Sequence, residues 1–264
     1  MLMLTHTWFM KKYLEDSDYP LAGEELFAFN VMPDLLPAHR DITAEMTHGI
    51  ARFGTLPPFS QREAFIRLHL LVDDLAHYGE ISPMGSDRFL SDTQGYTYLK
   101  GKPLVAPIMD FYRRIGKEID LPLACYRAHM IIEMAFDMVL CRNGEMGAIL
   151  LNTLYGSLRS VFAGDREDLN LFLSQIFDIN VETVSDAVDQ ISRGCTYAKL
   201  AALLDMKGRT GLYLDKFGLD STDDESLRGM TTLLNCGVAL VEDYQDFLAP
   251  AIKAIRQAGF SLPL

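Results

Sequence analysis

The stretch SQREAFIRLHLLVDDLAHYG, residues 60–79, decides the fold class. Its apolar residues recur at helical spacing, Ser60 and Glu63 form a capping box at its start, and Gly79 follows its last periodic residue. A second stretch, LACYRAHMIIEMAFDMVLC, residues 123–141, is apolar nearly all round and stops before Asn143-Gly144. The two stretches predict a helix over residues 60–78 and a second, interior helix over residues 123–141.

The rest of the chain continues this helical pattern. Alternating strand patterns and Asn-Gly hairpin signals between β-branched runs are missing from the sequence. Further helices are predicted over residues 146–163, 166–178, 181–204 and 223–257, the last with a capping box from Thr222 to Glu225 and a break at Pro250. We expect one all-α domain over residues 1–264, a multi-helix bundle in which residues 1–142 bind metal and residues 143–264 form a helical scaffold.

Residues 79–107 interrupt this pattern. The segment is rich in glycine, proline and polar residues, a composition that predicts a long surface loop. Such a loop is either a lid that shapes a substrate site, with Tyr96 and Tyr98 lining it, or a plain connector. The sequence alone does not choose between these two roles.

Composition excludes several classes of protein. Apolar residues make up 49% of the chain and charged residues 23%, which is typical of globular proteins. The formal net charge of -12 repels polyanions, so we expect neither nucleic acid nor an anionic membrane surface as a partner. The sequence contains no apolar run of membrane-spanning length, no secretory signal pattern and no C-x-x-C spacing. We expect a cytoplasmic protein that acts on a small-molecule or lipid substrate.

The first of the two main helices carries a stripe of potential metal ligands. His69, Asp73 and His77 stand four residues apart, so their side chains lie within roughly 80° of the helix circumference. Apolar residues surround the stripe, and an unpaired polar group in such an interior costs several kcal/mol. Something must therefore satisfy these side chains.

The second helix repeats the arrangement with His129, Glu133 and Asp137 among apolar neighbours. A buried helix that keeps one row of imidazole and carboxylate groups either binds a metal or holds a well-paired polar network. Imidazole nitrogen and carboxylate oxygen are ligands that suit zinc, manganese or iron. The paired stripes favour the metal site, and a metal-free polar network is the alternative.

Three further residues offer the same kinds of ligand. Asp34 follows Pro33 at a predicted turn, His48 lies on a short helix opened by Asp41, and His6 stands near the N-terminus. Fourteen residues separate Asp34 and His48, which is enough for a turn and a helix to bring both to a common site.

Other polar residues near the stripes have two interpretations each. Asp74 and Asp137 either orient the imidazoles from behind or are solvated helix positions. Arg127 either contacts a substrate phosphate or forms a surface ion pair. His39 is expected at the surface, and Trp8 is expected in the core.

The order and types of these residues resemble the motifs of the zinc-dependent phospholipase C and single-strand nuclease superfamily, including its phospholipase-C-like bacterial branch. That family presents an early histidine, an aspartate with a histidine about fourteen residues later, an H-x-x-x-D helix with a further histidine, and an H-x-x-x-E helix. The matching residues here are His6, Asp34, His48, His69, Asp73, His77, His129 and Glu133. The resemblance covers roughly the first 140 residues.

The resemblance implies an all-α fold that holds two or three zinc ions, with manganese or iron as alternatives. It implies that Asp73 bridges two metals and that Asp34 positions or deprotonates the water that attacks phosphorus. The implied activity is hydrolysis of a phosphoester, either phospholipid-headgroup-like or another small phosphodiester.

Two other interpretations of the function stay open. The acyl-carrier-protein phosphodiesterases are a second similarity, with an early histidine, an aspartate after a turn and helical His/Asp stripes, but the adjacent His-Asp pair expected there is missing. The other interpretation is a helical metal-binding or interaction protein without enzymatic activity. A carboxylate-bridged oxidase is disfavoured, because it needs E-x-x-H motifs on two helices and the sequence does not supply two.

Overall fold

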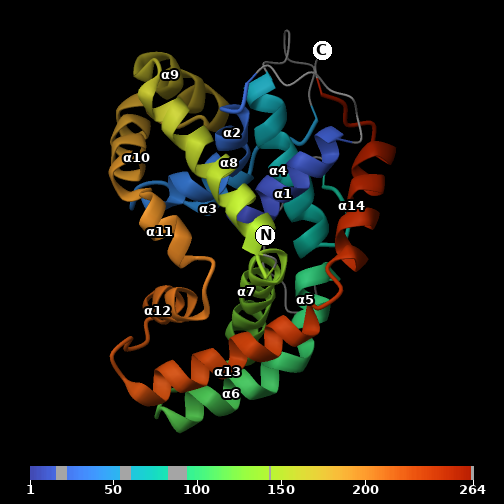
Figure 1. The fold of residues 1–264 in the computed structure, drawn as a ribbon, viewed down its shortest axis with the longest axis vertical. Coiled ribbons are helices and arrows are strands. Elements are labelled where there is room, and N and C mark those ends of the chain that lie inside the picture. Colours follow the sequence, from blue (N-terminus) through green and yellow to red (C-terminus); the bar gives the residue numbers. More distant parts are fainter. Residues whose placement is uncertain (16–22, 54–60, 83–93, 143, 263–264) are drawn as a thin grey trace.

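The computed structural model of the chain describes residues 1–15, 23–53, 61–82, 94–142 and 144–262. Within these residues every regular element is a helix, which confirms the all-α prediction (Figure 1). None of the described helices is both long and apolar enough to cross a bilayer.

The helices of the first half are α1 Met3–Glu15, α2 Leu26–Leu35, the 3-10 turn η1 Leu36–Ala38, α3 Ala44–His48, α4 Gln61–His77, α5 Tyr96–Gly101, the 3-10 turn η2 Lys102–Leu104, α6 Val105–Arg114 and α7 Leu121–Leu140. Both main helices are thus where the sequence predicts them. Two residues after the end of α4 lies Gly79, whose φ of 79° suits glycine. Asp120 caps α7 by accepting a hydrogen bond from the backbone N–H of Leu123.

The helices of the second half are α8 Gly144–Ala163, α9 Arg166–Phe177, α10 Val181–Gly194, α11 Tyr197–Ala202, α12 Met206–Lys216, α13 Asp224–Leu240 and α14 Gln245–Gln257. Three predictions here are wrong. The helix predicted over residues 181–204 divides at Cys195, and Thr196 caps the next helix. The helix predicted over residues 223–257 breaks at residues 241–244, while Pro250 lies inside α14. Its cap is Asp223, which accepts from the N–H of Ser226, instead of a box from Thr222.

The loop predicted over residues 79–107 is wrong from residue 96 onward. α5, η2 and the start of α6 occupy that part, whereas residues 83–93 lie outside the described residues, as does Ser60 of the predicted capping box. Gly101 explains part of the misleading composition, because a Cβ there would come within 3.1 Å of the Ala128 backbone on α7. Pro103 and Pro107 fall in first helical turns, where their missing N–H costs nothing.

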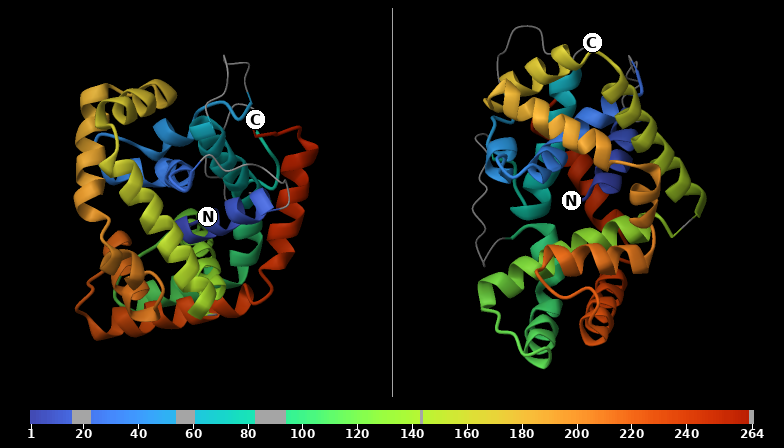
Figure 2. Two further views of the ribbon diagram at one scale, coloured as in Figure 1. Left: turned by 45° about the horizontal axis from the view of Figure 1, so that its top comes forward. Right: turned by 90° about the vertical axis from the view of Figure 1, so that its left-hand side faces the viewer.

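One apolar core joins the two halves of the chain. α4 packs on α2, where the side-chain amide of Asn30 donates to the carbonyl of Phe65, and α13 crosses α7 alongside α6 (Figure 1). The N-terminus lies amid the helices in all three views (Figures 1 and 2). Because α1 enters the middle of the bundle, its first residues reach the stripes on α4 and α7.

Candidate metal centre

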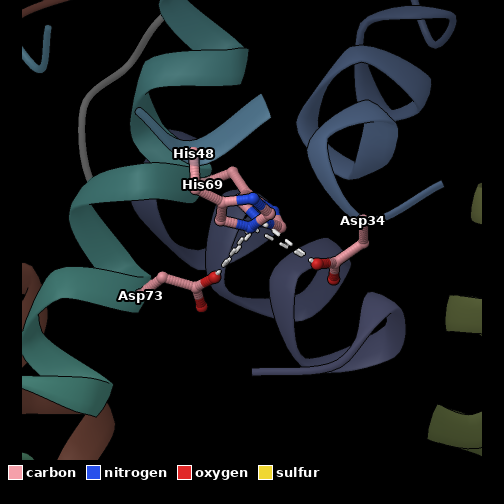
Figure 3. A group of neighbouring side chains, drawn as sticks. All are labelled: Asp34, His48, His69 and Asp73. Atoms are coloured by element: carbon pink, nitrogen blue, oxygen red, sulfur yellow. Dashed lines mark ion pairs between the residues drawn. The ribbon is translucent and has the colours of Figure 1, made fainter. Parts of the chain in front are cut away.

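Four of the predicted ligands form one cluster, which we call the Asp34 group: Asp34, His48, His69 and Asp73. They come from α2, α3 and α4, so three helices converge to build it (Figure 3). Asp34 lies in the last turn of α2, because Pro33 is inside that helix and does not form the predicted turn. The imidazoles stand between the two carboxylates, with ring nitrogens and carboxylate oxygens facing one another (Figure 3).

The distances within the Asp34 group fit a shared cation. Nε2 of His48 lies 3.6 Å from Asp34 Oδ1 and 3.5 Å from Asp73 Oδ2, and Nε2 of His69 lies 3.7 Å and 3.3 Å from the same atoms. These separations exceed the usual N–H···O length. Two ligands of a tetrahedral zinc, each about 2.1 Å from the ion, stand about 3.4 Å apart. The group could therefore hold a metal ion.

His48 is oriented by its own helix. Its Nδ1–H donates to the carbonyl of Ala44 at 3.0 Å and lies 2.9 Å from the Thr47 hydroxyl, which itself donates to the carbonyl of Pro33. These bonds leave Nε2 facing Asp34 and Asp73. A ring whose far nitrogen is fixed in this way is oriented as metal-binding histidines are.

The surroundings of His6 and His69 also favour a bound metal. Their rings stack with centroids 3.7 Å apart, and both nitrogens of each ring are buried without a hydrogen bond among the described residues. His6 Nε2 lies 3.2 Å from Asp73 Oδ1, although His6 belongs to neither ligand cluster. Buried nitrogens without hydrogen bonds are costly, and a metal ligated through them would remove the cost.

The other three predicted ligands form the Glu133 group: His77, His129 and Glu133. Here Nε2 of His77 lies 2.7 Å from Glu133 Oε1, a hydrogen-bond distance. The α-amino group of Met1 stands 3.0 Å from the same oxygen and 2.6 Å from Asp73 Oδ1. This group could bind a cation, but a proton and an ammonium already satisfy much of it.

Asp73 lies between the two groups. Its Oδ2 faces His48 and His69, while its Oδ1 faces His6 and the amine of Met1. The two oxygens of this carboxylate therefore contact different sets of groups.

Burial and neighbouring charges set the protonation of these side chains. Burial, together with the nearby His6, lowers the pKa of His69 to about 4, and burial lowers the pKa of His129 to about 3 against the pull of Glu133. Burial also lowers the pKa of His48, but the nearby carboxylates of Asp34 and Asp73 outweigh this effect and raise its pKa to about 10. His69 and His129 are thus neutral near pH 7, the form that binds a metal.

The buried carboxylates stay ionised. Burial alone would raise the pKa of Asp73 and Glu133, but the α-amino group of Met1 and the surrounding histidines outweigh it. The pKa of each carboxyl is therefore held below its ordinary value. Ionised carboxylates beside imidazole nitrogens are groups that could hold a divalent cation.

Asp74 binds Arg52 and does not contact an imidazole directly. Both oxygens of Asp74 bind the guanidinium of Arg52, at 2.7 and 2.9 Å, and Oδ2 also accepts from the backbone N–H of Ser82. Arg52 in turn donates to the carbonyls of His48 and Ile50. Asp74 therefore acts on His48 through Arg52 and the backbone, by holding the end of α3 against α4.

Asp137 likewise binds other side chains and not an imidazole. Its Oδ2 accepts from the buried Arg209 at 2.7 Å, and its Oδ1 accepts from the backbone N–H and the hydroxyl of Thr5 at 2.8 and 2.6 Å. The side chain thus joins α7, α12 and α1. Because Thr5 precedes His6, this contact places His6 beside the Asp34 group.

The remaining sequence expectations have mixed outcomes. Trp8 is buried, as predicted. Arg127 stacks on the Phe217 ring at 3.9 Å, which is neither of its two predicted roles. Tyr98 lies on α5 and stacks on His129 with centroids 4.5 Å apart, while Tyr96 donates to Asp246 away from the clusters.

A cavity of about 350 Å³ opens onto both ligand groups. Residues of the supposed scaffold also line it, namely Leu203, Arg209, Leu212, Tyr213 and Lys216. The description of residues 143–264 as scaffold is therefore incomplete. No histidine and no ligand spacing mark this part of the sequence, so the helical spacing within α12 was the one available signal.

Comparison of the chain with known protein families, with curated proteins and with solved structures finds no match. The resemblance of its motifs to the zinc-dependent phospholipase C superfamily therefore remains a prediction.

Proposed function

We propose that this chain is a divalent-metal-dependent hydrolase of small phosphoesters, with zinc as its metal. The observation that carries the proposal is the spacing in the Asp34 group, where four nitrogen-to-oxygen separations of 3.3–3.7 Å match the ligand separations of a tetrahedral ion. Zinc supplies Lewis acidity and lowers the pKa of water toward neutrality. The Glu133 group and His6 would hold a second or third ion.

The carboxylates of the site have different roles in such a reaction. Asp34 has the most exposed carboxylate of its group, at 26% side-chain exposure, and lines the cavity, so it can orient a water and take its proton. The buried Asp73 spans the two groups and stays a ligand. The three carboxylates Asp34, Asp73 and Glu133 carry less charge than two or three divalent ions, so the loaded site attracts a phosphate.

The experiment measures metal content and hydrolysis together. Protein purified without chelator should carry two or three zinc ions per chain and hydrolyse bis(para-nitrophenyl) phosphate, and a chelator should abolish the hydrolysis. His69→Ala should lose both metal and activity, while His39→Ala, outside both groups, should keep them. Wild-type protein that carries no metal, or hydrolysis that survives chelation, would refute the proposal.

A metal-free polar network is the second candidate, because the Glu133 group is partly satisfied by the bond from His77 and by the amine of Met1. It predicts unchanged thermal stability in chelator and no metal in the purified protein. An acyl-carrier-protein phosphodiesterase activity would appear in a separate assay, as release of phosphopantetheine from a carrier protein.

A further inference from the structure

One helix of the second half, α12, turns a complete face toward the cavity. Arg209, Leu212, Tyr213 and Lys216 all line it, and their spacing of three, four and seven residues places them on one side of the helix. This face is a wall of the same cavity onto which both ligand groups open.

The face runs from the floor of the cavity to its mouth. Arg209 is 1% exposed and Tyr213 is buried beside it, whereas Leu212 is 48% exposed and Lys216 is exposed one turn farther along. An apolar side chain that stays exposed at the rim of a polar cavity is suited to contact with a ligand.

The two cationic side chains on this face of α12 differ in whether a carboxylate neutralises them. The guanidinium of Arg209 is neutralised by Asp137 at 2.7 Å. The ammonium of Lys216 lies 5.6 Å from the Tyr213 ring centroid and forms no ion pair among the described residues. In a chain with a net charge of -12, an unneutralised cation at the mouth of a cavity is a candidate contact for an anion.

We infer that α12 recognises the part of the substrate that points away from the metals. Lys216 binds a second anionic group on that part, a carboxylate or a phosphate, and Leu212 and Tyr213 contact the short apolar portion that separates it from the phosphoester. The inference rests on the proposed function, because it takes the phosphoester to lie at the ligand groups. The substrate is small, since about 350 Å³ is near the lower limit for small-molecule sites.

The test compares two ligands that the protein cannot hydrolyse, phenylphosphonate and para-carboxyphenylphosphonate, by calorimetry on the metal-loaded protein. Wild type should bind the carboxylate-bearing ligand roughly fivefold to tenfold more tightly, as expected for one partly solvated ion pair. Lys216→Gln should lose this preference and Lys216→Arg should keep it. Lys207→Gln is the matched control, because Lys207 is an exposed lysine of the same helix that does not line the cavity.

Equal affinities in wild type, a preference that survives Lys216→Gln, or no binding of either phosphonate would overturn the inference. The proposed function fails separately, on the absence of metal or of diester hydrolysis. A carboxylate preference in a protein that does not hydrolyse diesters would leave α12 as an anion-binding wall and remove the reaction.

Discussion

Asp73 and Asp74 are adjacent in the sequence, but their side chains contact different groups. Asp73 points into the cavity and contacts two histidines of its group, while Asp74 points toward α3 and holds Arg52. Adjacent helical positions are about 100° apart, so one carboxylate can be a ligand while the next fastens the neighbouring helix. The sequence pattern identifies the ligand through its spacing from His69, but it cannot identify Arg52, which lies 22 residues from Asp74.

Replacement of Asp34 separates metal binding from proton transfer. Asp34→Asn keeps an oxygen that can bind a metal but removes the base, so kcat for diester hydrolysis should fall by roughly a hundredfold or more. Metal content should change little. Asp41→Asn is the control, because Asp41 is an exposed aspartate between η1 and α3. Full activity in Asp34→Asn would show that another group takes the proton.

At the scale of elements, the buried pair of Arg52 and Asp74 fastens the end of α3 to α4. Asp74→Ala leaves a buried guanidinium unpaired and should lower the free energy of unfolding by about 3–5 kcal/mol. Metal affinity should fall roughly tenfold to a hundredfold, because His48 is no longer held in place. Urea unfolding and a zinc-chelator competition measure the two effects.

The double variant Arg52→Met/Asp74→Leu distinguishes positioning from stability. It removes both charges, so much of the lost stability should return. Zinc affinity should stay low, because the carbonyl of His48 loses its donor Arg52 in this variant. Wild-type affinity in the double variant would mean that the pair only stabilises the fold.

The crossing of α13 over α7 depends on Gly237. A Cβ at this position would lie 2.8 Å from Cγ2 of Ile131 and 3.3 Å from Cβ of Ala135. Gly237→Ala should therefore cost about 1–3 kcal/mol through overpacking. Gly156 of α8 has open space around it, so Gly156→Ala should instead stabilise by up to about 1 kcal/mol. Thermal melts of the two variants should shift in opposite directions.

The helices that the sequence predicts are those with a distinct apolar face or a clear cap. α1 gave no such signal, because residues 4–10 are all buried and the segment has no polar side. Pro250 misled the prediction of α14, since residues 249 and 250 are exposed and water can satisfy the freed carbonyl nearby. The structure brings seven of the eight predicted ligands into two groups, and helical spacing marked five of them in the sequence: His69, Asp73, His77, His129 and Glu133. Arg52 and Arg209 were missed because their roles come from tertiary contacts.

At the scale of the whole molecule, the cavity is lined both by helices of the first half of the chain and by α12 of the second half. Residues of α2, α3, α4 and α7 supply the ligand groups, and α12 supplies the facing wall. The buried contact of Arg209 with Asp137 joins these parts, and the contact of Asp137 with Thr5 joins α1 to both. A ligand bound in the cavity would therefore touch both halves of the chain.

Metal binding should stabilise this whole assembly. An ion that binds the folded chain and not the unfolded one, present at a hundred times its Kd, adds about 2.7 kcal/mol. For a chain of this size that corresponds to a rise in Tm of roughly 5–10 °C over chelated protein. The increase should disappear in His69→Ala and persist in His39→Ala, measured by calorimetry with and without zinc. Zinc that leaves the Tm of wild type unchanged would mean that the two carboxylate and imidazole groups are a polar network, held together by the Met1 amine and the His77 hydrogen bond, since those contacts form without any ion.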